Sequence, residues 1–271
     1  YTGEDTLSLH DALPIYCHHK LKIVVNDKPI EGDGPVGKFG GAIVLPPIPG
    51  LHEYLGTIDV NSLYPSAMRS INISFDTLIG QFTETHDAYE AVINRSDKKL
   101  TMVFEDGAVE SLTGKEWNTI LKDVNCSISG YGTVFSLDKQ GIIPALLTDW
   151  FRQRKEFKRR SGEFESKYLE AKKTDEALAN KYYDEYKLYD LMQMTFKLRL
   201  NSTYGACGNR FFRFYDIRMA ESTTKTGREL LFHMAKTVGK CQNGMYEYPN
   251  QFVLGGDTDS IFFLTLQGTY E

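Results

Sequence analysis

The chain has 271 residues, of which 41% are hydrophobic, 25% charged and 13% aromatic, and its formal net charge is −5. This apolar content is sufficient for a buried core and excludes a low-complexity disordered chain. No run of about 18 apolar residues is present, so we expect no membrane-spanning helix and no membrane partner. The negative total, taken alone, argues against nucleic-acid binding, because proteins of that class usually carry a basic surface.

The cysteines and the N-terminus argue against zinc binding and secretion. The four cysteines form no C-x-x-C pair, so we expect free thiols rather than a zinc site or a disulfide framework. The N-terminus lacks the basic-then-apolar order of a signal peptide, and residues 6–15 (TLSLHDALPI) look like translated adapter sequence. We therefore expect residues 1–16 to be a non-native or artefactual leader, and the protein to be cytoplasmic, in the host cell cytoplasm if viral.

The first half of the chain is rich in short β patterns. Apolar runs bounded by glycine and proline predict strands at residues 21–25, 40–45 and 53–60. A short helix is expected after Pro65, and β runs that alternate with turns continue through residues 98–137.

A helical pattern begins after Gly141. Apolar residues recur at helical spacing over residues 143–172 and predict one long helix. Asp175 is the expected N-cap of a second helix, which ends near Tyr204 with Gly205 as its left-handed stop. The short connection predicts an antiparallel helical hairpin.

The C-terminal part returns to mixed structure. Residues 221–240 predict a helix, and residues 251–264 predict a β-hairpin. We expect the turn of this hairpin to contain Gly255, Gly256 and Asp257.

The charge is unevenly distributed along the chain. Residues 141–210 carry 14 Lys or Arg and 10 Asp or Glu, a balance of +4, whereas the remainder carries −9. The cations concentrate in residues 151–160 (FRQRKEFKRR). The predicted helical hairpin is therefore the part that is suited to face phosphates, despite the acidic total.

Three carboxylates stand at the ends of apolar strands. Asp59 closes one strand, and Asp257 and Asp259 are two apart on a segment that we expect to be extended, so both would point to one face. Clustered carboxylates repel unless a divalent cation lies between them. A site with only oxygen ligands favours Mg²⁺, with Mn²⁺ as a substitute. Two such ions about 3.5–4 Å apart suit phosphoryl transfer. The competing interpretation is that G-D-T-D is only a hairpin turn.

The order of three motifs favours the catalytic interpretation. The chain carries DVNSLYPS at 59–66, KLRLNSTYG at 197–205 and GDTDS at 256–260. These motifs resemble those of the family B (α-like) DNA polymerases. The segments GAIVLPPIPG, SINISFDTLIG, GIIPALLTDWFRQRKEFK and NRFFRFYDIRMA are similar to the T-even bacteriophage replicative polymerases within that family. The resemblance covers about residues 38–264.

The resemblance implies an α+β fold. A polymerase palm, made of an antiparallel sheet with flanking helices, would carry an inserted antiparallel two-helix fingers subdomain. Five segments are expected: the leader 1–16, a connector 17–38, the first part of the palm 39–140, the fingers 141–209, and the second part of the palm 210–271. The exonuclease and thumb regions of the family would be missing, so we expect a palm-and-fingers fragment.

The resemblance also implies roles for individual residues. Asp59, the Val60 carbonyl and Asp259 would hold the two catalytic metal ions, and Asp257 would be a more peripheral catalytic acid. The residues expected to bind the dNTP are Ser62, Leu63, Tyr64, Arg154, Lys158, Lys197 and Asn201. Those expected at the nascent base pair or minor groove are Tyr204, Gly205 and Thr258. Lys197 is also a candidate general acid for pyrophosphate.

Helical spacing supports part of this assignment. Arg154 and Lys158 are four residues apart, which places them on one helix face. If the two helices are antiparallel neighbours, these cations and Lys197 converge on one cleft suited to the β- and γ-phosphates. By contrast, Lys155, Arg159 and Arg160 belong to other faces, and we expect a solvated surface there. Tyr64 would exclude a 2′-hydroxyl by steric clash.

The expected function is a template-directed DNA polymerase core, which adds dNTPs to a primer 3′-hydroxyl by two-metal-ion nucleotidyl transfer. Its expected partners are primer–template DNA and dNTPs, with a sliding clamp and a single-strand DNA-binding protein expected of the family only. Three alternatives stay open: a protein-primed family B polymerase, a catalytically idle DNA-binding fragment, and a magnesium-dependent phosphatase or nuclease. The last would explain the acids but not Tyr64 or the Lys197–Tyr204 helix face.

Overall fold

The computed structural model describes residues 13–14, 16–22 and 40–265. The helices are the π-helix η2 (Cys17–Leu21), α2 (Leu63–Ser70), α3 (Ala88–Ile93), α4 (Gly114–Asp123), α5 (Ile142–Ala171), α6 (Glu176–Cys207) and α7 (Ile217–Asn243). The strands are β1 (Val44–Leu45), β2 (Leu55–Asp59), β3 (Leu78–Phe82), β4 (Lys99–Phe104), β5 (Val109–Thr113), β6 (Cys126–Ile128), β7 (Thr133–Ser136), β8 (Val253–Asp257) and β9 (Ser260–Leu264). The predicted α+β class, with antiparallel sheet, flanking helices and a helical hairpin, is confirmed.

A four-stranded antiparallel sheet brings residues 44–59 together with residues 253–264. Its order is β1-β8-β9-β2, and β2 pairs with β9 so that Asp59 lies opposite Ser260. Helix α7 covers one face of this sheet, and Leu231, Ala235 and Ile261 lie in the core between them. Only part of the strand predicted at residues 40–45 forms, and most of the one at 21–25 lies outside the described residues.

The β runs predicted between residues 98 and 137 do not join that sheet. With β3, which precedes that range, they form a separate five-stranded sheet, β5-β4-β3-β7-β6, with its own core around Trp117 and Phe82. Helices α3 and α4 were not predicted. A capping box marks the start of α4: Thr113 accepts from the Glu116 N–H, and the Glu116 side chain accepts from the Thr113 N–H.

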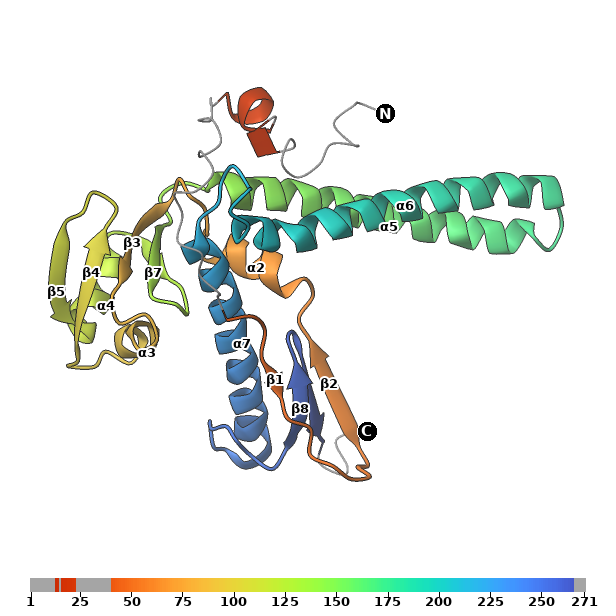
Figure 1. Cartoon of the computed structure of the whole chain (residues 1–271). Helices are drawn as coiled ribbons and strands as arrows, with labels where there is room; N and C mark the ends of the chain where they lie inside the picture. Colours follow the sequence, from red (N-terminus) through yellow and green to blue (C-terminus); the bar gives the residue numbers. More distant parts are fainter. Residues whose placement is uncertain (1–12, 15, 23–39, 266–271) are drawn as a thin grey trace.

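The long helical hairpin of α5 and α6 projects from the rest of the molecule (Figure 1). At about 1.5 Å per residue, each helix is about 45 Å long. The predicted N-cap is confirmed, because the Asp175 side chain accepts from the Leu178 N–H at 3.0 Å. The predicted stop at Gly205 is wrong: α6 continues to Cys207, and Gly205 does not have a positive φ. Since a helical backbone needs no left-handed residue until it ends, glycine alone does not mark the end.

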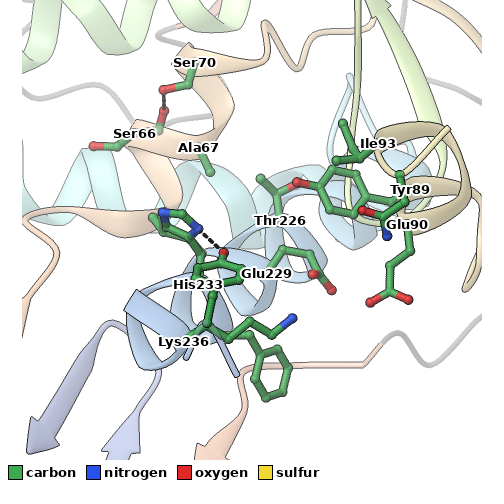
Figure 2. A pocket seen from close by; sticks show the side chains of 14 residues that line it. Ser66, Ala67, Ser70, Tyr89, Glu90, Ile93, Thr226, Glu229, His233 and Lys236 are labelled. Carbon is green, nitrogen blue, oxygen red and sulfur yellow. Dashed lines mark hydrogen bonds between the residues drawn. The ribbon is translucent and has the colours of Figure 1, made fainter. Parts of the chain in front are cut away.

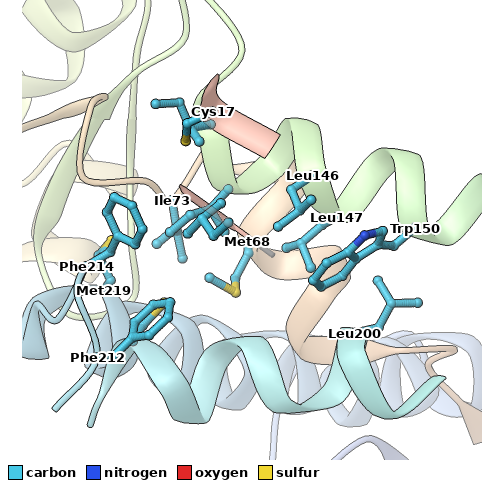
Figure 3. Close-up of a cluster of buried hydrophobic side chains, with 14 of the residues drawn as sticks. Cys17, Met68, Ile73, Leu146, Leu147, Trp150, Leu200, Phe212, Phe214 and Met219 are labelled. Atoms are coloured by element: carbon cyan, nitrogen blue, oxygen red, sulfur yellow. The ribbon is translucent and has the colours of Figure 1, made fainter. Parts of the chain in front are cut away.

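A hydrophobic core fixes the base of this hairpin against α2 and the beginning of α7 (Figure 3). Met68 of α2 packs with Leu147 and Trp150 of α5, Leu200 of α6 and Met219 of α7. The cluster therefore holds the first turn of α2 at a set position relative to both long helices.

The same core reaches the N-terminal region. Leu13 and Cys17 are buried in it, at 1% and 0% exposure. The assignment of residues 1–16 as a leader stays a prediction, because residues 1–12 and 15 lie outside the described part of the chain.

Buried hydrogen bonds complete the attachment of the hairpin. The Asn72 side chain donates to the carbonyls of Ser136 and Lys139 and accepts from the Gly141 N–H. The N-terminus of α5 is capped by residues distant in sequence, because Asp76 accepts from the Ile142 N–H. These contacts leave the start of the hairpin little freedom.

The cysteines agree with the expected free thiols. Cys17, Cys126, Cys207 and Cys241 are free thiols. Burial raises the pKa of the Cys207 thiol to about 12 and that of Cys17 to about 11, so neither is reactive. Within the described ranges, no helix is long and apolar enough to cross a membrane.

Candidate active site

The segment after β2, the turn between β8 and β9, and the N-terminus of α2 lie close together. The Val60 N–H donates to the Asp259 carbonyl at 2.8 Å, which ties the segment after β2 to the hairpin turn. The Thr258 N–H donates to Ile43 at 3.1 Å, which ties that turn to the segment before β1. Two non-glycine residues here, Ser62 and Thr258, are left-handed, with φ of 56° and 53°. Such strained conformations concentrate at functional sites.

The acidic hairpin differs from the predicted one. Gly255 and Gly256 lie within β8, Asp257 pairs with Ser260, and the turn contains Thr258 and Asp259. Asp257 and Asp259 are therefore not on one extended segment with parallel side chains. The reason is the left-handed Thr258, which reverses the chain so that the Asp259 N–H donates to the Asp257 carbonyl at 2.6 Å.

The turn nevertheless brings the carboxylates into electrostatic contact. Burial raises the pKa of Asp259 above its ordinary value, and the charges of Asp59 and Asp257 raise it further. A carboxyl group surrounded by like charges prefers the protonated form unless a cation is present. The charges of Asp59 and Asp257 therefore act on Asp259, and the metal-binding role of these acids stays a prediction.

A cavity of about 480 Å³ opens beside these acids. Its walls come from the end of β2, the first turn of α2, both long helices and the hairpin turn. The lining residues are Asp59, Asn61, Ser62, Leu63, Tyr64, Pro65, Arg154, Lys197, Asn201, Tyr204, Thr258 and Asp259. Most of the predicted site residues therefore share one cavity.

Four predicted site residues do not line this cavity. Lys158 is exposed on α5, one turn beyond Arg154, and Gly205 is exposed on α6. Val60 and Asp257 lie next to lining residues. Conversely, the sequence interpretation gave no role to Asn61 or Pro65, although both lie inside the DVNSLYPS motif that could have indicated them.

The two cations of the cavity lack acidic partners. Arg154 donates to the Ser62 hydroxyl at 3.3 Å, and its buried Nε has no hydrogen-bond partner among the described residues. Neither Arg154 nor Lys197 forms an ion pair with any residue that the structure describes. A buried guanidinium nitrogen without a partner is costly and points to an anionic ligand.

The first turn of α2 presents an aromatic ring to the cavity. Tyr64 and Tyr204 lie with ring centroids 4.5 Å apart and planes at 49°. Burial raises the pKa of the Tyr64 hydroxyl, and Tyr204 adds to the effect. The backbone N–H groups of this first turn have no partner within the helix. Such a helix start can bind anions.

A second cavity, of about 500 Å³, lies between α2, α3 and α7 (Figure 2). His233 and the Tyr246 hydroxyl are 2.6 Å apart in it. Burial raises the pKa of Glu229, and the nearby Glu90 adds to this rise. None of the predicted site residues line this cavity.

Comparison with known proteins identifies the family. The family model described as DNA polymerase family B matches residues 13–271, and the chain belongs to this family. The DNA-directed DNA polymerase of Escherichia phage RB69 is 32% identical over 266 residues, which cover 84% of this chain and 27% of that protein. The DNA-directed DNA polymerase of Enterobacteria phage T4 is 26% identical over 270 residues, which cover 86% and 27% respectively.

A solved structure supports the fold. The family B DNA polymerase of the hyperthermophilic archaeon Pyrobaculum calidifontis is 24% identical, with a TM-score of 0.50 over 96% of this chain and 26% of that chain. The chain thus spans about a quarter of the length of the relatives that it matches. The resemblance to T-even phage polymerases seen in the motifs is confirmed.

Proposed function

We propose that this chain is the catalytic core of a template-directed DNA polymerase that transfers dNTPs to a primer 3′-hydroxyl. The observation that carries the proposal is the cavity shared by the three sequence motifs. Its lining combines acids of two motifs, cations of the two long helices, and the rings of Tyr64 and Tyr204. Family membership supports the same reaction class. Primer–template DNA and dNTPs are the partners that this function requires.

The architecture suggests which part of the chain supplies each group of the site. We assign the four-stranded sheet and α7 to the palm, in segments 39–140 and 210–271, and the helical hairpin to the fingers, in segment 141–209. The palm supplies the carboxylates, and the fingers supply the cations. Movement of the hairpin toward the palm would bring Lys158 to the phosphates and enclose the nucleotide, as closing lids do in other enzymes.

The carboxylates fit a divalent metal ion. Asp59, Asp259 and the Val60 carbonyl offer only oxygen donors, which suits Mg²⁺ or Mn²⁺. Burial raises the pKa of Asp259, and so does repulsion from Asp59 and Asp257, which a cation would relieve. Among the described residues, no three His, Cys, Asp or Glu side chains are grouped to hold an ion. Triphosphate oxygens would therefore complete the ligand set. When bound, two ions lower the pKa of the primer hydroxyl and neutralise charge on the pyrophosphate.

The cavity's other groups fit a triphosphate. Arg154 and Lys197 would bind its β- and γ-phosphates, because both are cations without an acidic partner in the described part of the chain. The N–H groups of the first turn of α2, at Leu63 and Tyr64, would bind phosphate oxygens. Asn201 would contact the nucleotide, while Tyr204 and Thr258 would contact the nascent base pair.

In the proposed reaction, the primer 3′-hydroxyl loses its proton to solvent water, O3′ forms a bond to the α-phosphorus, and the bond from that phosphorus to the bridging oxygen breaks. The electron pair leaves with pyrophosphate. Lys197 lines the cavity and would donate a proton to this leaving group as a general acid. Arg154 would stabilise the negative charge that develops there.

Sugar selection provides a specific test. Because the ring of Tyr64 would occupy the space of a 2′-hydroxyl, Tyr64→Ala should increase ribonucleotide incorporation at least ~10-fold relative to dNTPs. The measurement is single-nucleotide extension by the complete polymerase, meaning the protein encoded by the whole reading frame that contains this chain. Tyr64→Phe keeps the ring and should keep the selectivity. Unchanged sugar discrimination in Tyr64→Ala would reject this role.

The reaction itself is tested by extension of a DNA primer on templates of defined sequence. We expect Mg²⁺-dependent incorporation of the complementary dNTP. Template-independent incorporation would contradict the proposal, as would incorporation without a divalent cation. Extension that starts only from a hydroxyl group of a protein would indicate protein priming instead of DNA priming.

A further inference from the structure

A glycine lies in the interior of α7, where this helix crosses α2. Gly227 is the eleventh residue of α7 and is buried. Glycine weakens a helix interior, so its presence there calls for a packing reason. The surroundings provide one: a Cβ atom on Gly227 would lie 3.1 Å from Tyr64 Cε1 and 3.2 Å from Leu63 Cδ2. Both contacts are tighter than ordinary van der Waals separations.

The ring of Tyr64 is confined on two sides. Gly227 lies on one side, and on another is the ring of Tyr204, with a centroid separation of 4.5 Å. The cavity, which both rings line, adjoins them. A methyl group at Gly227 would push the Tyr64 ring away from α7. If α2 moved as a whole instead, Leu63 and Tyr64 would move together, because both belong to its first turn.

We infer that Gly227 is a positioning residue that sets how far the Tyr64 ring reaches into the cavity, and thereby the space left for the sugar of the incoming nucleotide. The inference rests on the proposed function, in which Tyr64 contacts that sugar. With alanine at this position, the ring enters space that a deoxyribose needs. Deoxynucleotides then bind less well, while ribonucleotides stay excluded.

The test is a double-mutant cycle in the complete polymerase, read by single-nucleotide extension. Gly227→Ala should raise the KM for dNTPs about 10-fold, with a smaller change in kcat, because sub-ångström misplacement in a rigid site costs about this much. The same change in a Tyr64→Ala background should alter KM by less than about twofold, since no ring remains to be displaced. In a Tyr64→Phe background the 10-fold effect should return.

Gly162→Ala is the matched control. Gly162 lies on α5, is exposed, and has nothing within 4 Å of its Cβ position. This variant gains the same methyl group in a helix and should leave the KM unchanged. Should Gly227→Ala reduce the yield of folded protein, the Tyr64→Ala/Gly227→Ala pair should restore it. Failure of that rescue would contradict the inference, as would an equal rise in KM with and without the ring.

A crystal structure of the Gly227→Ala variant separates this inference from the proposed function. We expect the Tyr64 ring to lie farther from α7 than in the wild type, whether or not the protein extends primers. An unmoved ring overturns the inference. A wild-type protein that extends no primer, or a Tyr64→Ala variant with unchanged sugar selection, overturns the proposed function instead.

Discussion

Charged groups are arranged in opposite ways in the cavity and on an exposed surface of α5. This surface carries Glu156, Arg159 and Arg160 and is called the outer face below. On the outer face, Glu156 accepts from Arg159 and Arg160, and these hydrogen bonds lower the pKa of Glu156 to about 2. In the cavity, burial raises the pKa of Asp259 and the charges of Asp59 and Asp257 raise it further, and Arg154 has no acidic partner among the described residues.

The charges on the outer face are neutralised within the protein, whereas those in the cavity need a ligand. Opposite charges on the outer face satisfy one another in water, which is typical of a solvated helix. Like charges in the cavity repel, and folding alone gives no reason to gather them. A metal ion beside the acids and a phosphate beside the cations would supply the missing partners. Four further predictions test this contrast.

The largest expected effect comes from the acids. Asp59→Asn or Asp259→Asn should lower the rate of primer extension by at least ~10³-fold, because the loss of a ligand weakens the hold on the metal ion. Circular dichroism should show an intact fold, since Asp59 is exposed and Asp259 only partly buried. Glu156→Gln, on the outer face, is the control and should retain full activity. Normal extension by both single variants would contradict the assignment of Asp59 and Asp259 as metal ligands.

A smaller effect is expected from the cations. Arg154→Ala or Lys197→Ala should reduce kcat/KM for dNTPs about 10–100-fold, the loss expected for one hydrogen bond to a charged group. Arg159→Ala removes a cation from the same helix but should change kcat/KM less than about twofold. Equal losses for Arg154→Ala and Arg159→Ala would show that general positive charge matters, rather than the cavity.

The smallest effect concerns stability and pH. Because the pKa of Asp259 is raised, its charged form opposes folding, and Asp259→Asn should be about 0.5 kcal/mol more stable than the wild type at pH 7 without metal. The difference should vanish well below pH 3.8, where this carboxyl is protonated in both the folded and unfolded states. Urea unfolding at several pH values measures it. Added Mg²⁺ should stabilise only the wild type, and equal stabilisation of both proteins would contradict the assignment.

Glu156 should show the opposite pH dependence. Its pKa is lowered to about 2, so the stability that its ion pairs contribute is complete above the ordinary value of 4.5 and is lost as the pH falls through about 2. Unfolding of Glu156→Gln beside the wild type over this range measures that contribution.

Local patterns in the sequence were sufficient for the long helices. The apolar spacing of α5 and the N-cap Asp175 depend on residues within one or two turns, so they can be read along the chain. The end of α6 was misjudged because Gly205 is compatible with a helix interior. The separate five-stranded sheet was missed because a strand's periodicity does not reveal which sheet it joins.

For the candidate site, too, some features could be predicted from the sequence and others could not. The chemical groups could be recognised in the sequence, because three ordered motifs and the basic segment 151–160 identified the acids, cations and rings, and with them the family. Their arrangement depends on the tertiary structure, which puts Asp259 beside Asp59, Lys158 outside the cavity, and Gly227 against Tyr64. These residues belong to segments up to about 200 residues apart. Such contacts depend on how helices and sheets pack together, which no local pattern contains.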